Sequence, residues 1–401
     1  MSNARLSFAA LFLAGALVAG CSSDDSNGST PNGQGESDAS VGNGSEGGGG
    51  EGGTLGDGGP GAGDGGPSGD AGPSPTGLDE TGATIPDTNY PAPAGAIYMA
   101  PNGVDTAAGS EAAPVLTLAK AIALVPSGGT IVVRGGTYRD GAVQTSKPFT
   151  LQAYPHEKPW FDGTDLPAAS AWTNDGAGHW TMPWNTPTFC GGHYYDSPYD
   201  AQTTANTGPC SHYDMVNAAY VDTQYAAVGD PQMVFVDGVY VHEVTTLAAA
   251  TGANFYYDQT AKKMYVASDP ALHEVEVAAR PSALIFSGAG TKILGIGFKR
   301  YATNEYSNAD VGAVYGGGTG ALFENDVFTE MAGGALATSP SSTVSLSVFA
   351  KNGFNGMGSN GHQHSTKEAD GLVIQGSIFN ANNQEHFGDH CSASCAQAGV
   401  K

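Results

Sequence analysis

Two loops near the end of the chain hold the residue types best suited to chemistry. They span residues 360–370 and 383–391 and combine histidines, carboxylates and a lysine on a background of Asn and Gly. Carboxylate oxygens are the ligands that Ca²⁺ prefers. A bound ion can acidify a neighbouring C–H bond, so that a lysine or a neutral histidine removes the proton. The candidate Ca²⁺ ligands are Glu368, Asp370 and Asp389; the candidate bases are Lys367, His362, His364 and Lys401; the candidate substrate contacts are Glu385, His386 and His390.

Each of these residues also has a simpler interpretation, because polar loops are often solvated turns with no chemical role. A glycosidase site is a further alternative, since it needs two carboxylates that flank the cleaved bond. Asp370 with Glu385 or Asp389 could supply them, although the spacing in the sequence does not single out a pair.

The cysteines suggest disulfides more than a metal site. His386 and His390, followed by Cys391 and Cys395, have the residue types of a Zn²⁺ site. In an oxidising compartment a disulfide between the two cysteines is the stronger expectation. By proximity in the sequence, the other pair is Cys190 with Cys210.

The beginning of the chain has the features of an export signal. Arg5 precedes an apolar run over residues 6–20 that is too short to remain as a membrane-spanning helix. The run ends in Val18-Ala19-Gly20-Cys21, which resembles the lipobox of bacterial lipoproteins. The resemblance implies a lipidated Cys21 at the outer membrane or cell surface, with a lipid anchor as the only membrane contact. A chance cysteine beside an ordinary signal peptide (residues 1–20) is the alternative.

Residues 21–94 are predicted to form a disordered tether. They are rich in Gly, Ser, Asp and Pro and contain acidic residues but no Lys or Arg. Such a composition cannot bury enough apolar surface to offset the loss of chain entropy. As a flexible coil, the tether would span roughly 50 Å.

The charge of the chain limits its partners. The formal net charge is −24, and acidic residues outnumber basic ones in the body after residue 94 as well. Nucleic acid is therefore excluded as a partner, because its binding requires clustered Lys and Arg. A polyanionic polysaccharide would need bridging cations. We expect a monomer whose partner is an extracellular polysaccharide.

The elements that must position the late loops begin with the segment 98–138. A turn of Pro, Asn, Gly and Asp precedes a short helical pattern with apolar residues at Leu116, Ala119, Ile122 and Ala123. A Pro-Ser-Gly-Gly turn then leads into a β-branched strand over residues 130–133, which ends at a Gly-Gly-Thr-Tyr sequence. This order resembles the N-terminal cap and first coil of right-handed parallel β-helix proteins of the pectate-lyase-like superfamily. The resemblance implies an all-β solenoid with a short capping helix.

Four later runs share one pattern, a short apolar strand that ends in Phe: residues 292–298, 321–328, 344–349 and 372–379. The terminal phenylalanines are 30, 21 and 30 residues apart, which fits coils of about 22 residues with inserted loops. Alternation along the strands predicts that Leu322, Leu346 and Ile374 point inward. Asn352 and Asn382, three residues past a Phe, are predicted to stack inside a turn. An antiparallel β-sandwich is the alternative fold.

The coil pattern divides the body into three parts: 95–164 with the cap and first coils, a β-rich insertion over 165–278, and further coils over 279–401. In the insertion, Met233–Val241 with its Asp-Gly turn reads as a hairpin, and residues 254–267 read as a second one. Residues 398–401 have the pattern of a new strand. We therefore expect that this sequence is truncated and ends before the last coil is capped.

The family resemblance also implies a function. Pectate-lyase-like enzymes eliminate across a uronate with the help of a metal ion, so a polysaccharide lyase that uses Ca²⁺ is the leading expectation. A non-catalytic glycan-binding module and a glycoside hydrolase are the alternatives.

Overall fold

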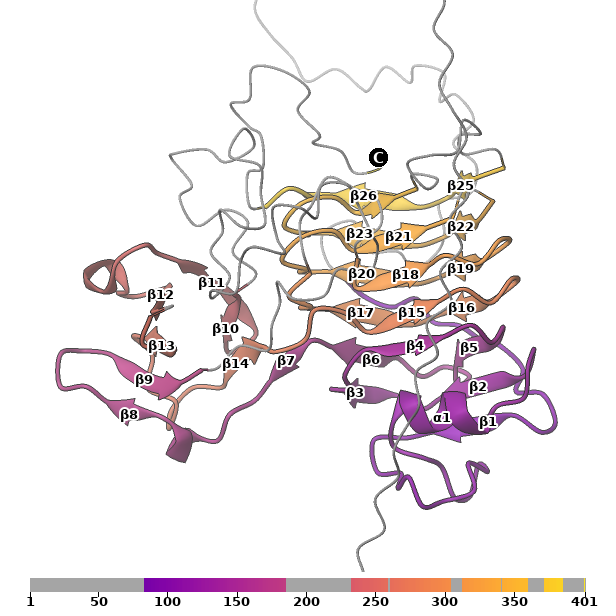
Figure 1. Ribbon diagram of the computed structural model, residues 1–401, viewed down its shortest axis with the longest axis horizontal. Helices are drawn as coiled ribbons and strands as arrows, with labels where there is room; N and C mark the ends of the chain where they lie inside the picture. Colours follow the sequence, from indigo (N-terminus) through magenta and orange to yellow (C-terminus); the bar gives the residue numbers. More distant parts are fainter. Residues whose placement is uncertain are drawn as a thin grey trace, which may run out of the picture. The chain divides into compact units, whose positions relative to one another are not determined.

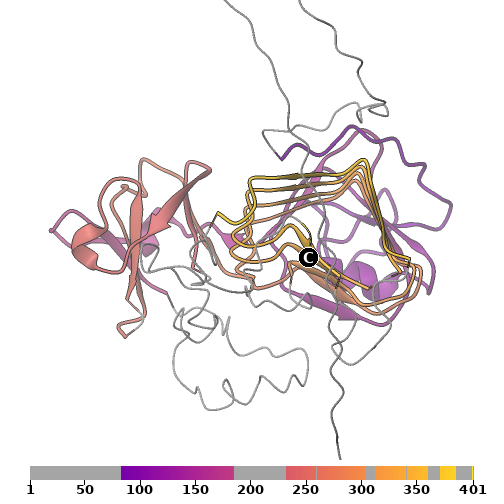
Figure 2. The same cartoon turned by 90° about the horizontal axis from the view of Figure 1, so that it is seen from above.

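The computed structural model describes residues 83–184, 232–258, 260–303, 312–339, 341–359, 371–384 and 400. These residues form an all-β protein whose main body is a parallel β-helix, as the sequence predicts. In each coil the chain passes through three sheets in turn, and every strand pairs in parallel with its equivalents in the adjacent coils. Figure 1 shows the coils as stacked layers, and Figure 2, turned by 90°, shows their strands lying over one another.

The three sheets are named here in the order in which the chain enters them. The first sheet contains β1 (Ile97–Met99), β2 (Thr130–Val133), β5 (Thr150–Ala153), β16 (Lys292–Leu294), β19 (Leu322–Glu324), β22 (Thr343–Ser345) and β25 (Val373–Gln375). The second sheet contains β3 (Gly136–Tyr138), β6 (Pro159–Asp162), β17 (Gly297–Lys299), β20 (Val327–Thr329), β23 (Val348–Ala350) and β26 (Ile378–Asn380). The third sheet contains β4 (Val143–Thr145), β15 (Leu284–Phe286), β18 (Val314–Gly316), β21 (Leu336–Thr338) and β24 (Met357–Gly358).

A short helix, α1 (Leu118–Leu124), packs against the first coil, as predicted. Thr117 caps its N-terminus by accepting a hydrogen bond from the backbone N–H of Lys120, 3.2 Å away. The predicted apolar face is only partly right, because one of its four residues is buried and three are not. Leu118, Ala121 and Ile122 are buried, whereas Leu116, Ala119 and Ala123 are exposed.

A row of aromatic rings runs through the interior of the second sheet. Phe298, Phe328, Phe349 and Phe379 occupy equivalent positions in successive coils. Their ring centroids are 5.2, 4.9 and 4.7 Å apart, and the rings are stacked. The predicted repeat of Phe-ended strands is therefore confirmed, and stacking continues the core from coil to coil.

The predicted inward row of the first sheet is wrong by one position. The buried row runs through Ile293, Phe323 and Val344, whereas Leu322 pairs with Lys292 and Thr343 on the outward side. Leu346 lies outside any strand, with φ 51° at the corner between β22 and β23. Ile374 does align with Val344, but it is 37% exposed.

The predicted asparagine pair is confirmed. Asn352 donates through Nδ2 to Oδ1 of Asn382, 2.9 Å away. Each amide also donates to a backbone carbonyl at the end of the second sheet, Asn352 to Phe328 and Asn382 to Phe349. The two side chains thus satisfy backbone groups that the tight corner leaves unpaired.

A mostly antiparallel eight-stranded sheet interrupts the coils between β6 and β15. Its strands are β7 (Thr164–Asp165), β8 (Thr173–Asn174), β9 (Trp180–Pro183), β10 (Val234–Val236), β11 (Val239–Glu243), β12 (Asn254–Asp258), β13 (Lys263–Val266) and β14 (Val275–Ala278). Two single-turn 3-10 helices, Ala169–Ala171 and Leu247–Ala249, accompany the strands. Both predicted hairpins are present, β10 with β11 and β12 with β13. Trp172 is buried in the core of this sheet.

Residues 83–94, which the sequence assigns to the tether, pack along the outside of the coils. Ile85 is fully buried against Val327 and Val348 of the second sheet. Further along the segment, Tyr90 donates a hydrogen bond to Glu324, 2.9 Å away. We call residues 83–94 the strap, because they connect several coils.

At the other end, Val400 pairs in parallel with Met357 and so continues the third sheet. The predicted strand at the end of the chain thus begins in register with the coils. No helix in the described residues is both long and apolar enough to span a membrane.

Candidate functional site

The site residues predicted from the sequence lie outside the described part of the chain. This holds for all of the predicted bases, Ca²⁺ ligands, substrate contacts and cysteines: Cys21, Cys190, Cys210, His362, His364, Lys367, Glu368, Asp370, Glu385, His386, Asp389, His390, Cys391, Cys395 and Lys401. Their roles stay predictions.

The strands that flank the two loops attach them to different corners of the coil. The segment 360–370 connects β24 of the third sheet to β25 of the first sheet. The segment 385–399 connects β26 of the second sheet to Val400, which pairs in the third sheet. The loops therefore join the third sheet at its opposite sides. Within the described residues, no three His, Cys, Asp or Glu side chains are grouped so that they could hold a metal ion.

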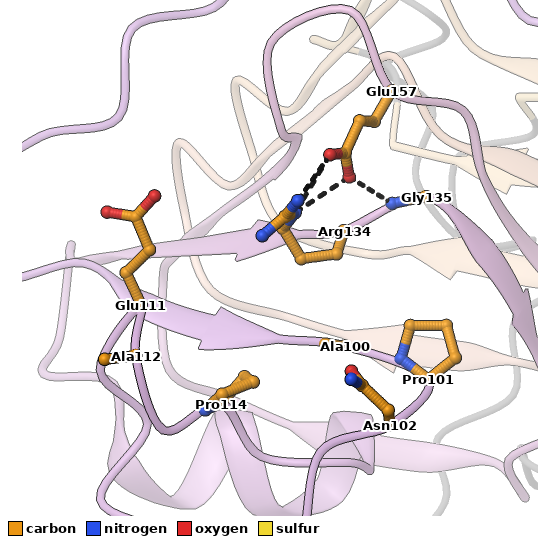
Figure 3. A pocket seen from close by; sticks show the side chains of 9 residues that line it. All are labelled: Ala100, Pro101, Asn102, Glu111, Ala112, Pro114, Arg134, Gly135 and Glu157. Carbon is orange, nitrogen blue, oxygen red and sulfur yellow. Dashed lines mark hydrogen bonds and ion pairs between the residues drawn. The ribbon is translucent and has the colours of Figure 1, made fainter.

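A pocket of about 420 Å³ lies at the first coil, beside the loop that precedes α1. Figure 3 shows Arg134 between Glu111 and Glu157, with Pro101 and Asn102 along the opposite wall. Arg134 follows β2 directly, and Glu157 lies in the turn that precedes β6. Successive coils thus place both side chains at one rim.

The charged groups of the pocket are firmly paired. Arg134 donates from Nε and Nη2 to the carboxylate of Glu157 at 2.7–3.0 Å, and the backbone N–H of Gly135 adds a bond of 2.6 Å. These hydrogen bonds, with that of Arg134 the largest contribution, hold the pKa of Glu157 below its usual value. The guanidinium lies 4.2 Å from the ring centre of Tyr154, whose hydroxyl donates to Glu111 at 2.8 Å.

The residues that line the pocket can donate hydrogen bonds to a small polar molecule and accept hydrogen bonds from it. Nε and Nη2 of Arg134 are engaged by Glu157 in a bidentate pair, which offsets the charge of the cation. We therefore regard the pocket as a candidate for binding hydroxyl groups and not as a catalytic centre.

A second polar site lies on the outer face of the second sheet. Through Oδ2, Asp162 at the end of β6 forms an ion pair with Lys299 at 3.2 Å and accepts a hydrogen bond from Arg139 at 3.4 Å. Its other oxygen, Oδ1, accepts from the backbone and hydroxyl of Thr164 at 3.0 and 2.8 Å. Asp162 and Lys299 are paired in register, and Arg139 follows the residue that pairs with Phe161, so three coils contribute to one row.

This row is linked to the inserted sheet. Glu276 of β14 accepts from Arg139 at 2.5 Å and forms an ion pair with Arg300. Arg300 also contacts Glu330 at 2.7 Å and the carbonyl of Gly238 at 2.8 Å. We call Arg139, Asp162, Glu276, Lys299 and Arg300 the Asp162 network.

Sequence reasoning missed the Asp162 network, although part of its signal was present. Arg139 follows the Gly-Gly-Thr-Tyr sequence, and Lys299 follows a core Phe, so both have positions fixed by recognisable repeats. Glu276 could not have been found in the same way, because it lies 137 positions from Arg139 along the chain.

Comparison with known proteins gives two informative similarities, and no family model matches the chain. The chain is 38% identical over 82 residues to pectate lyase PEL9 of Emericella nidulans, a match that covers 19% of this chain and 20% of PEL9. Its structure is similar to that of XylC in complex with xylose, with a TM-score of 0.57 and 15% identity. That match covers 76% of this chain and 56% of XylC, and at this identity it shows the fold alone. The chain thus spans about a fifth of PEL9 and about half of XylC.

Proposed function

We propose that this protein is a polysaccharide lyase that cleaves a uronate-containing glycan by β-elimination. The observation that carries the proposal is the 38% identity to a pectate lyase over 82 residues, in a chain that folds as a parallel β-helix. The fold alone would leave the activity open, because one fold supports many activities.

In such a reaction a base removes the proton on the carbon next to the carboxylate. The electron pair forms a carbon–carbon double bond while the bond to the glycosidic oxygen breaks, and that oxygen then takes up a proton. A Ca²⁺ ion, when bound, would neutralise the uronate carboxylate and acidify this proton. Lys367 is the proposed base, and Glu368, Asp370 and Asp389 are the proposed ligands, on the chemistry of their side chains.

The proposal is tested by incubating the full chain with pectate and with alginate in the presence of Ca²⁺. We expect products with a new double bond, which absorb in the ultraviolet, and we expect a chelator to abolish their formation. Lys367→Ala should lower turnover without changing the melting temperature, and Asp370→Asn should raise the Ca²⁺ concentration needed. The exposed Lys292→Ala is a matched control for loss of a lysine.

A glycan-binding module is the second candidate, and the pocket at Arg134 favours it. The pocket offers hydrogen-bonding groups that are held in fixed positions by their own ion pair. Glycan binding without double-bond formation, on several uronate polymers with Ca²⁺ present, would exclude the lyase and favour this candidate.

A further inference from the structure

The outer face of the second sheet carries a tryptophan that lies flat on the neighbouring coil. Trp160 of β6 is paired in register with Gly297 of β17. A Cβ atom added to Gly297 would lie only 2.6 Å from Cδ2 and 2.7 Å from Cζ3 of Trp160. The indole therefore rests directly on the backbone of the next coil, in space that only a glycine leaves free.

The ring is partly covered and partly open. One part of it packs against the cluster of Ile85, Val327 and Val348, which fixes its orientation. The side chain as a whole keeps an intermediate exposure, and the residue before it in the same row, Thr137 of β3, is exposed. A partly exposed indole in a fixed orientation is suited to stacking against a sugar ring, which has apolar C–H groups on its faces.

One cation lies beside this ring, and a second shares its carboxylate partner. The ammonium of Lys299 is 5.8 Å from the ring centre of Trp160, and Asp162 holds it there at 3.2 Å. Arg139 contacts the same carboxylate oxygen, Oδ2 of Asp162, at 3.4 Å. Lys299 forms an ion pair with Asp162, and its ammonium group carries three donor hydrogens.

The exposure of the charged side chains determines which of them a ligand can contact. The side chains of Arg139 and Lys299 are 31% and 23% exposed, whereas those of Asp162 and Glu276 are 0% and 4% exposed. The carboxylates that balance the cations are therefore hidden beneath them. Of these charged groups, a ligand next to the aromatic surface would therefore meet mainly the two cations, although the protein as a whole has a net charge of −24.

We propose that Trp160, Lys299 and Arg139 form a subsite for one uronate unit of a glycan. The sugar ring stacks on the indole, and its carboxylate contacts Lys299 and Arg139. The choice of a uronate rests in part on the proposed function, whereas the placement of the subsite rests on the geometry alone.

The test is a titration with a galacturonic acid trisaccharide in the presence of a chelator. Because the chelator stops the proposed Ca²⁺-dependent reaction, the titration reports binding alone. We expect calorimetric binding, with a change in tryptophan fluorescence, that is about tenfold tighter than for the neutral galactose trisaccharide, since a charge-assisted contact is lost in the neutral sugar. Lys299→Met should remove this preference, and Lys292→Met, on the first sheet of the same coil, should leave it unchanged.

Two variants separate a ligand contact from a structural role. Lys299→Arg keeps a cation above Asp162 and should retain most of the preference. Gly297→Ala should displace the indole and weaken binding of both trisaccharides, and melting temperatures identify any variant that is simply unfolded. Equal affinity of wild type and folded Lys299→Met for the acidic trisaccharide would overturn the proposal, even if the protein proved to be a lyase. Loss of the preference in Lys299→Met, together with no double-bond formation by the wild type in the separate assay with Ca²⁺ present, would support the subsite and reject the lyase.

Discussion

At the scale of single residues, buried carboxylates differ in how they are satisfied. Asp162 is fully buried, but it forms ion pairs with two cations and accepts a hydrogen bond from the hydroxyl of Thr164. These contacts compensate its charge. Asp326 is equally buried in the corner between β19 and β20, yet its Oδ2 has no hydrogen-bond partner in the described structure. Burial raises the pKa of Asp326 well above the ordinary value of 3.8.

This difference predicts how stability depends on pH. The folded state binds the proton of Asp326 more tightly than the unfolded state does, so its contribution to stability is complete below pH 3.8 and is lost as the pH rises toward the folded-state pKa. Asp326→Asn keeps the Oδ1 acceptor for the backbone of Ile296 and cannot ionise. We expect the variant to have a higher melting temperature at neutral pH and a weaker decline of stability above pH 4. A decline identical to that of wild type in urea unfolding across this range would contradict the assignment.

At the scale of strands and corners, the repeat is regular in the strands and irregular between them. The corner between the first and second sheets uses a residue with positive φ in successive coils, namely Gly295, Asn325, Leu346 and Gly376. Side chains alternate between inside and outside only along an extended strand. A residue with left-handed backbone interrupts this alternation, so the inward positions of one strand do not predict those of the next. For this reason the sequence pattern predicted the repeat of Phe-ended strands but assigned Leu346 to the core.

The observed register gives a test with neighbouring residues. Val344 is fully buried in the row of the first sheet, and Thr343 beside it faces outward. Val344→Asp should unfold the coils, since an unpaired buried charge costs several kcal/mol against a typical total stability of about 5–15 kcal/mol. Thr343→Asp should change stability by about 0.5 kcal/mol or less, as is usual for surface positions. Similar urea midpoints for the two variants would show that the register is wrong.

At the scale of the whole molecule, the sequence predicted the structure where short residue patterns of turns and strands recur along the chain. The capping helix, the parallel coils, both hairpins and the asparagine pair follow from short patterns of Gly, Asn, Phe and β-branched residues. The Asp162 network and the burial of Ile85 do not, because they join segments far apart in the chain through single contacts. The predicted catalytic loops have no repeating pattern, and the structure does not describe them.

The predicted export signal at residues 1–21 leads to a further prediction about the whole molecule. If Cys21 carries the lipid anchor, the mature protein should enter the detergent phase, and mass spectrometry should find a lipidated cysteine at its N-terminus. Cys21→Ser should release the protein from membranes while leaving the melting temperature of the β-helix unchanged, since the coil strands begin at Ile97. An unmodified N-terminus, or a variant that stays in the membrane fraction, would rule out this anchor.

The strap has a consequence for the order in which the protein folds. Tyr90 and its partner Glu324 are 234 positions apart, so a chain that emerges from its N-terminus exposes the strap long before the coils that bind it exist. Closing such a distant contact is slow and entropically costly compared with adding one coil to its neighbour. The coils should therefore assemble first, and docking of the strap should be the final step. Until that step the apolar surface around Val327 and Val348 stays open to solvent, so this is the stage of folding at which the protein most needs protection from aggregation.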